Sequence, residues 1–206
     1  FAQAKPSAVG FDMLFTAPDV NDPQRVLASQ ATAVDQALRQ QLSKVVGEAR
    51  LEAAVDASVA ALGSMESTDD HFEFALFAAP VVLARRAALD DELAALAARD
   101  GTNQPPADPM AVVVEGPDPR RFLATFSGSS TNLRRFEAQA RGIGFISATN
   151  ADADGVIRSV PLVANVAGRI VPTLPVEMLR VAQSAGGKGE AEVTIETDNN
   201  GVVAVR

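Results

Sequence analysis

The sequence predicts an α/β fold in which helices flank a mixed central β-sheet, with a helical insertion near residues 23–62. Residues 8–15 are apolar apart from Gly10 and Asp12, and this run is short enough for a strand buried on both faces of a partly parallel sheet. Apolar residues at helical spacing fill the insertion. Residues 144–180 are then predicted to form, in this order, a strand, an acidic turn, two more strands and a helix.

The insertion is predicted to contain two helices. Asp22 and Pro23 make a good helix start, and the apolar residues after them recur every three or four positions to about residue 46. A second apolar stripe covers residues 51–62, and Gly63 is a suitable C-cap. These residues are therefore expected to form a helical hairpin.

The middle of the chain is predicted to alternate helices and short strands. Ser67 and Asp70 have the spacing of a capping box, before a helix that Pro80 ends. Residues 81–84 are a predicted buried strand, a short helix follows, and the proline-containing stretch 102–109 is a surface loop. Because strand-like residues follow this loop at once, we expect all 206 residues to form a single domain.

The last part of the chain carries clear local signals. Residues 127–132 are predicted to be a polar loop that caps a helix ending at Gly142. Gly168 marks a turn between two strands, and a helix follows from about Pro172. An Asn-Gly pair at 200–201 stands between apolar runs, which is the strongest short signal for a β-hairpin.

Composition limits the function. The net charge is -8, and no run of Lys or Arg is longer than a pair, which argues against nucleic acid as a partner. No apolar run approaches the roughly 18 residues that span a bilayer. The chain has no cysteine and a single histidine, His71, and it lacks the motifs of nucleophilic or phosphate-binding sites. We therefore predict no catalytic residue, no metal site and no cofactor.

The acidic turn permits two interpretations. Asn150, Asp152, Asp154 and Gly155 match a calcium-binding loop through its sixth position. The twelfth position, where that loop needs a bidentate Glu, is Pro161. The favoured interpretation is a hairpin turn, in which Asp and Gly supply positive-φ residues and side-chain hydrogen bonds to the backbone.

Asp12 is the main candidate for a role beyond packing, because a carboxylate in an apolar strand is costly to bury unless it is paired. Arg158, on the strand expected after the acidic turn, is one partner that we predict for it. If they pair, replacing either with Ala should cost about 3 kcal/mol. In a mixed α/β sheet, ligands favour the carboxyl ends of strands, which adds the loop around Asp19. The candidate ligand-binding residues are Asp12, Asp19, Asp154 and Arg158.

The chain resembles the second type of CHASE domain, the cyclases/histidine kinases associated sensory extracellular family. The resemblance is based on a Gly-Phe strand, a D-x-DG-x-x-R turn and strand, a Pro-Leu, a Gly turn and a Pro-started helix. Here these are Gly144-Phe145, residues 152–158, Pro161-Leu162, Gly168 and residues 172–179. Residues 9–15 with Pro18-Asp19 provide a second match, and Asp70 with residues 80–84 a third.

The sequence departs from the family pattern in three places. The family's opening portion, with its first strand and tryptophan-proline turn, is absent, so we expect a domain truncated at its N-terminus. Residues 22–63 are longer than the loop expected there, and residues 85–110 have the character of an insertion.

The resemblance implies an extracytoplasmic sensor domain of a bacterial transmembrane receptor, on the periplasmic or extracellular side of the inner membrane. An adenylate cyclase, histidine kinase or similar output would lie outside these residues, and the domain itself would do no chemistry. Its partner would be a small-molecule or protein signal of unknown identity, and a homodimer is one assembly open to it.

Two other classes of function stay open from the residues alone. One is a metal-assisted hydrolase that uses Asp12, Asp19 and Asp154. The other is a structural or oligomerisation domain.

Overall fold

The computed structural model confirms a mixed α/β protein. It describes residues 4–26, 28–30, 36, 50, 53–54, 56–57, 60, 66–92, 94–95, 112–146, 154, 160–185 and 191–206. The chain divides into two compact units, Pro18–Glu73 on the one hand and Phe1–Ala17 with Phe74–Arg206 on the other. The organisation into a single domain stays a prediction.

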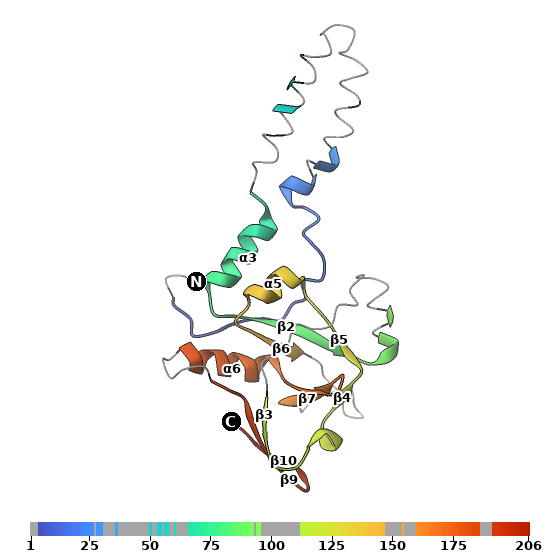
Figure 1. The fold of residues 1–206 in the computed structure, drawn as a ribbon, viewed down its shortest axis with the longest axis vertical. Helices are drawn as coiled ribbons and strands as arrows, with labels where there is room; N and C mark the ends of the chain where they lie inside the picture. Colours follow the sequence, from blue (N-terminus) through green and yellow to red (C-terminus); the bar gives the residue numbers. More distant parts are fainter. Residues whose placement is uncertain are drawn as a thin grey trace. The chain divides into compact units, whose positions relative to one another are not determined.

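The first sheet of the larger unit is built around β2 (Val81–Ala88), whose residues are buried except Arg86. β6 (Gly142–Ile146) runs parallel to β2 along one edge. β1 (Val9–Phe11) pairs parallel with the first three residues of β2, and β5 (Gly128–Ser130) pairs antiparallel with the last three. Since β6 pairs with residues from both halves of β2, β1 and β5 share the opposite edge (Figure 1).

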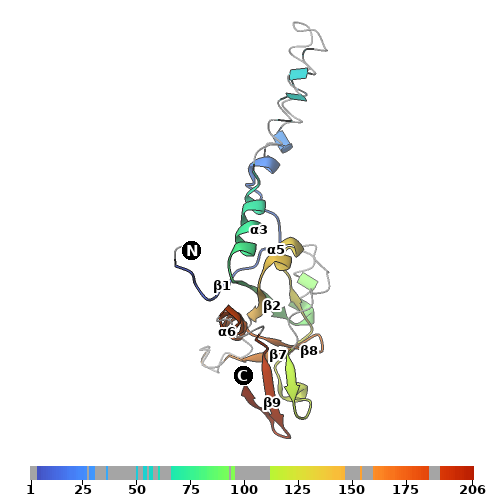
Figure 2. The ribbon, with the colours of Figure 1, turned by 60° about the vertical axis from the view of Figure 1, so that its left-hand side comes forward.

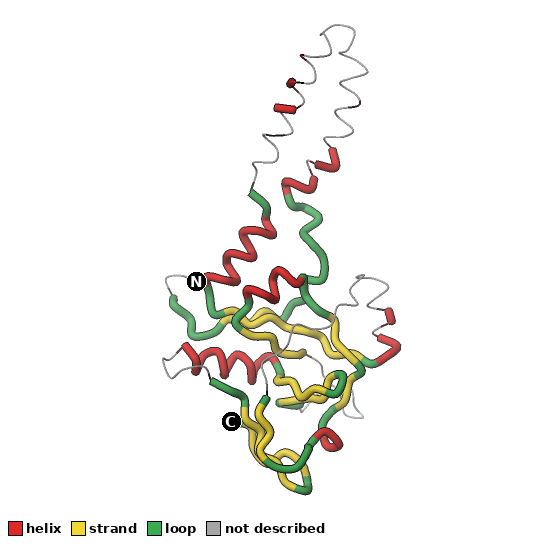
Figure 3. The backbone as a smooth tube through the Cα atoms, in the orientation of Figure 1, coloured by secondary structure: helices red, strands yellow, loops and turns green. Residues whose placement is uncertain are grey.

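Two smaller sheets complete the described strands, drawn in yellow in Figure 3. One has the order β4-β7-β8, with β4 parallel and β8 antiparallel to β7. The other has the order β10-β9-β3, with β10 antiparallel and β3 parallel to β9. Their bounds are Thr125–Phe126 (β4), Val163–Val166 (β7), Arg169–Pro172 (β8), Val113–Glu115 (β3), Thr194–Asp198 (β9) and Gly201–Val205 (β10).

The named helices are α3 (Thr68–Ala78), α5 (Arg134–Gln139) and α6 (Leu174–Ala185), with a 3₁₀ turn at Arg120–Phe122. Figures 1 and 2 both show α6 lying alongside the first sheet, where it contacts β1, β2 and β6. Leu174 and Val181 of α6 are buried there with Val82 and Ala84 of β2.

Glycines on β6 allow α6 to lie very close to the sheet. A Cβ atom added at Gly144 would stand 2.4 Å from the Cα of Leu174, which is backbone of α6. One added at Gly142 would stand 2.3 Å from the carboxylate of Glu177. The distance between β6 and α6 therefore depends on the absence of side chains at these two positions.

Glu177 also forms a buried ion pair within α6. Its carboxylate is fully buried and accepts from Nε and Nη2 of Arg180 at 2.9 and 2.7 Å. Nη2 of Arg180 further donates to the carbonyl of Arg141 at 3.1 Å, and Nη1 donates to that of Ala191 at 3.3 Å. The pair thus ties α6 to the segments that precede β6 and β9.

Most elements predicted in the larger unit are confirmed. They include the strand-turn-strand at Gly168, the helix after it and the hairpin near the C-terminus. In that hairpin the two turn residues are Asn199 and Asn200, and Gly201 begins β10 with φ +136°. The predicted strand at 156–160 lies, apart from Val160, outside the described residues.

For three predicted segments, the observed strands have other bounds than those expected. The strand expected over residues 8–15 is only Val9–Phe11 and is half-buried. The strand expected over 81–84 continues to Ala88. The loop expected over 127–132 contains β5, because the second half of β2 offers that segment a strand edge with which to pair.

The residues of the predicted helical insertion that the structure describes are helical at the positions given next. Residues 23–26, 28–30 and 36 are helical, and so are 50, 53–54, 56–57 and 60. The helix that the capping box predicts is α3, and the backbone N–H of Asp70 donates to the hydroxyl of Ser67 at 3.4 Å.

Replacing Gly144 with Ala should destabilise the fold by about 1–3 kcal/mol, since the new methyl group meets the backbone of Leu174 and forces α6 outward. Urea denaturation provides the measurement. Gly10→Ala is the control. A Cβ there also meets an atom at 2.4 Å, but that atom is the sulfur of the flexible Met178 side chain, so a smaller loss is expected. Equal losses in the two variants would contradict the account of close packing.

Arg180→Met should reduce stability by about 3–5 kcal/mol, because it leaves the buried carboxylate of Glu177 without its cation. The same denaturation experiment measures this loss. Arg86→Met is the matched control, since the Arg86–Glu92 pair is exposed, with side chains 49% and 44% accessible, and should cost less than about 1 kcal/mol. A loss at Arg180 as small as that at Arg86 would show that the buried pair contributes little.

Candidate functional site

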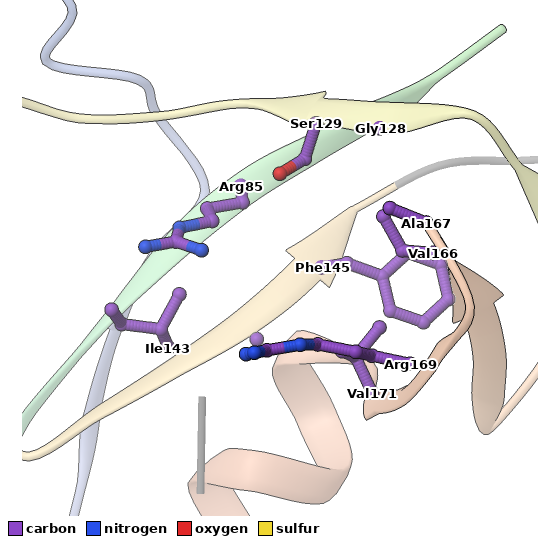
Figure 4. A pocket seen from close by; sticks show the side chains of 10 residues that line it. Arg85, Gly128, Ser129, Ile143, Phe145, Val166, Ala167, Arg169 and Val171 are labelled. Atoms are coloured by element: carbon purple, nitrogen blue, oxygen red, sulfur yellow. The ribbon is translucent and has the colours of Figure 1, made fainter. Parts of the chain in front are cut away.

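A cavity of the larger unit lies between the first sheet and the β7–β8 hairpin. Its volume is about 260 Å³. Figure 4 shows the side chains that line it, from β2, β5, β6 and the hairpin. They belong to Arg85, Gly128, Ser129, Ile143, Gly144, Phe145, Val166, Ala167, Arg169 and Val171.

The hairpin owes its shape to a two-residue turn. Ala167 and Gly168 both have positive φ angles, 51° and 81°, as required by the turn that matches the twist of two antiparallel strands. Val166 and Arg169 are consequently direct partners across the hairpin. The turn thereby brings an apolar and a cationic side chain to the same cavity.

Arg85 is the buried polar group of this site. It is 5% exposed, and its guanidinium forms a two-pronged ion pair with Glu137 of α5. Nε donates to Oε1 at 2.8 Å and Nη2 to Oε2 at 2.5 Å. This geometry holds the guanidinium in one orientation.

Asn132 supports the ion pair from the loop between β5 and α5. Its backbone N–H and its side-chain Nδ2 donate to Oε1 of Glu137 at 3.1 and 3.3 Å. Nδ2 also donates to the carbonyl of Ala84 at 2.9 Å, and Oδ1 accepts from the backbone N–H of Phe15 at 2.8 Å. Asn132 therefore joins Glu137, the partner of Arg85, to β2 and to the segment at Phe15.

The cavity has a cationic end and an apolar end. In Figure 4 the guanidinium groups of Arg85 and Arg169 lie toward Ile143, while the ring of Phe145 lies by Val166 and Ala167. Phe145 and Val166 belong to a core cluster with Phe126, Ala87 and Ala164. Among the described residues that line the cavity none is acidic, and none of them is a histidine beside Ser129. The arrangement suits binding of a small molecule with two unlike ends.

A second cavity of about 660 Å³ lies by β1, the end of α3 and the end of α6. Its walls are mainly alanine and other apolar residues, and Lys5 is the one charged residue among the described residues that line it. A binding site needs a few well-placed polar groups to orient its ligand, so the first cavity is the better candidate.

The expectation that Asp12 is a buried carboxylate is wrong. β1 ends at Phe11, so Asp12 follows the strand and is exposed. A stability cost of stranding a buried charge therefore does not apply to it. Arg158 lies outside the described residues, and its pairing with Asp12 stays a prediction. Asp154 is exposed and lies in a turn, and the rest of that predicted turn and the strand after it, up to residue 159, lie outside the described residues.

Asp19 belongs to the smaller unit, where it caps local backbone. Its Oδ1 accepts from the N–H of Asn21 at 2.9 Å, and its Oδ2 accepts from the hydroxyl of Thr68 at 2.9 Å. The Asp19 N–H in turn faces the carboxylate of Asp69, at 3.3 and 3.4 Å from its two oxygens. These contacts give Asp19 a structural task, and its role in ligand binding stays a prediction.

Asp22 is the buried centre of the same network. It is 1% exposed and accepts from the hydroxyl of Ser67 at 2.5 Å and from the N–H of Thr68 and Gln24, each at 2.9 Å. One carboxylate therefore caps both the helical residues that begin at Pro23 and the start of α3. The pKa of Asp22 is lowered from 3.8 to about 2, and the hydrogen bond from the hydroxyl of Ser67 is the largest cause. Burial acts in the opposite direction and raises the pKa. Hydrogen bonds from the Arg25 N–H, the Thr68 hydroxyl and the Gln24 N–H lower it further.

Within the described ranges, no group of three or more His, Asp or Glu side chains could hold a metal ion. Asp19 lies in the smaller unit, and Asp12 and Asp154 lie in the larger one. The metal-assisted hydrolase stays an alternative from the sequence.

Sequence reasoning did not identify Arg85 and Arg169 as site residues. In the sequence Arg85 forms a basic pair with Arg86, one residue beyond the predicted buried strand 81–84. A charge in a buried strand needs a partner, and Arg85, not Asp12, is the charged residue in such a strand. Arg169 follows the turn glycine, a position that carries no signal of its own.

The larger unit is thus a mixed α/β body with a small cavity that is walled by a buried arginine and apolar side chains. The sequence model of the CHASE2 domain matches residues 1–205. The chain belongs to the CHASE2 family, whose members are extracellular sensory domains. No curated protein and no solved structure shows significant similarity to it.

Asp22→Asn should destabilise the smaller unit at neutral pH, and the difference from the unaltered chain should disappear in acid. Because the folded-state pKa lies below the ordinary 3.8, ionised Asp22 stabilises the fold above that pH. This contribution is lost as the pH falls from 3.8 toward about 2. Denaturation at a series of pH values measures it.

Asp12→Asn is the control, since the exposed Asp12 should change stability little at any of these pH values. Ser67→Ala should narrow the pH range over which the stabilising effect of Asp22 is lost, because it removes the hydroxyl that lowers the pKa of Asp22 most. A constant difference between Asp22→Asn and the unaltered chain down to pH 2 would contradict this account.

Proposed function

We propose that this chain is the extracytoplasmic signal-sensing domain of a bacterial transmembrane receptor, on the periplasmic or extracellular side of the inner membrane. The observation that carries the proposal is its membership of an extracellular sensory family over nearly its whole length. No helix in the described part of the chain has both the length and the hydropathy needed to cross a bilayer. The membrane anchor belongs to the rest of the parent protein.

The output of the receptor, an adenylate cyclase, a histidine kinase or a similar domain, lies elsewhere in the parent protein under this proposal. The sensory domain does no chemistry. Its task is to bind a signal more tightly in one of two conformations than in the other. The cavity supports this role, because its walls come from two sheets. A molecule between them contacts both the first sheet and the β7–β8 hairpin, and favours the spacing at which it fits.

Reporter fusions to the parent protein in a bacterial host test the proposal. Alkaline phosphatase, which is active only outside the cytoplasm, should be active when it is fused directly after residue 206. A cytoplasmic reporter such as β-galactosidase should be inactive at the same position. The reciprocal control places both reporters after the output domain, where the activities should be reversed. Active β-galactosidase after residue 206 would overturn the assignment to the outer side of the membrane.

A further inference from the structure

We infer that Asn200 is a site of spontaneous covalent modification, at which the side-chain amide becomes a carboxylate through a cyclic imide, and that Asp198 restrains this reaction in the folded chain. The inference concerns the hairpin of β9 and β10 and goes beyond the proposed sensory function. It follows from the residues of the turn, from the hydrogen bond of the Gly201 nitrogen, and from what the reaction requires of that nitrogen.

Asn200 has a neighbour that favours the reaction. It is the one asparagine of the sequence that a glycine follows. The backbone nitrogen of the following residue is the nucleophile, and a glycine has no Cβ to obstruct its approach. Asn199 is followed by Asn200, whose side chain hinders the same attack. Both asparagines are exposed in the turn, so the two sites differ mainly in the nucleophile.

The reaction closes a ring between the two residues. The Gly201 nitrogen attacks Cγ of the Asn200 side chain, so that a new N–Cγ bond forms and the Cγ–Nδ2 bond breaks. The proton of the backbone amide leaves with the side-chain nitrogen as ammonia. Water from the solvent then opens the cyclic imide at one of its two carbonyl groups, which gives either aspartate or isoaspartate at position 200. No oxidant or reductant takes part.

In the folded chain, Asp198 holds the nucleophile. Its Oδ1 accepts from the backbone N–H of Asn200 at 2.7 Å and from that of Gly201 at 3.0 Å. Gly201 is also the direct partner of Asp198 across the hairpin. The hydrogen bond keeps the Gly201 N–H directed at the carboxylate, whose negative charge opposes the loss of the amide proton. Intramolecular attack is fast only when the reacting atoms are aligned, so the turn has to open locally before the ring can close.

The modification would weaken the hairpin that contains it. The aspartate product places a second carboxylate in the turn, two residues after Asp198. The isoaspartate product lengthens the backbone by a carbon atom just before Gly201. That carbon displaces β10 along β9, where Gly201 pairs with Asp198 and Val202 with Thr197. Each modified chain is therefore expected to open at this turn more readily than an unmodified one.

Incubation of the 206-residue chain in mildly alkaline buffer over several days tests the inference. Trypsin releases residues 189–206 as one peptide, because Lys188 precedes it and no Lys or Arg interrupts it before Arg206. Fragment mass spectra should show conversion at residue 200 exceeding that at residue 199. A sample digested before the incubation provides the baseline. The free peptide 189–206 in the same buffer should convert at residue 200 at least about five times faster than the folded chain, since it lacks the hydrogen bonds of the fold.

Asp198→Ala should raise the rate in the folded chain about five-fold, because it removes the acceptor of the Gly201 N–H. Asp198→Asn keeps an Oδ1 acceptor without the charge and should give an intermediate rate. Arg121→Gln is the matched control. Arg121 donates to the carbonyl of Asn199 at 3.0 Å, so this variant loses a hydrogen bond at the same turn without touching the Gly201 nitrogen, and its rate should change much less. Thermal melts check that all variants are folded.

Three results would each overturn the inference. The first is conversion at residue 199 that equals or exceeds conversion at residue 200, and absence of conversion from both the chain and the peptide counts with it. The second is a folded chain that reacts as fast as the free peptide. The third is an equal change of rate in Asp198→Ala and Arg121→Gln. None of these results bears on the reporter experiment, which tests the sensory function separately.

Discussion

A buried ion pair between Arg85 and Glu137 is the contact on which the larger unit depends. It joins the central strand β2 to helix α5 with side chains that are 6% and 4% exposed. Buried pairs of this kind often add little net stability, because both charges lose their water, but breaking one is costly. Their stronger effect is to permit one arrangement of the elements that they join. Here Asn132 extends that effect to the backbone of Phe15 and Ala84.

The second buried pair applies the same constraint to α6. Glu177 and Arg180 lie on one helix, yet Arg180 reaches carbonyl groups from two other segments. Gly142 and Gly144 allow the helix to come close enough for these contacts. The position of α6 on the sheet therefore depends on the missing side chains at two positions of β6 and on the ion pair of α6. Larger side chains at residues 142 and 144 would hold the helix farther from the sheet.

Local signals in the sequence predicted the elements whose causes are local. The Asn-rich turn before Gly201, the turn at Gly168 and the capping box at Ser67 each specify a structure within a few residues. β5 was missed because Gly-Ser-Ser has little intrinsic strand preference and becomes a strand only by pairing with Arg86 to Ala88, forty or more residues earlier. The site depends on such distant pairings, so Arg85 and Arg169 could not be brought together from the sequence.

The two arginines of the cavity differ in how freely evolution can change them. Arg85 is locked into the core by Glu137, so its replacement disturbs the fold itself. Arg169 is exposed at the hairpin tip, and its substitution should cost little stability. The lining of the cavity can therefore change at the hairpin while the core stays as it is. One wall of the cavity is part of the folding machinery of the domain, and the other is not.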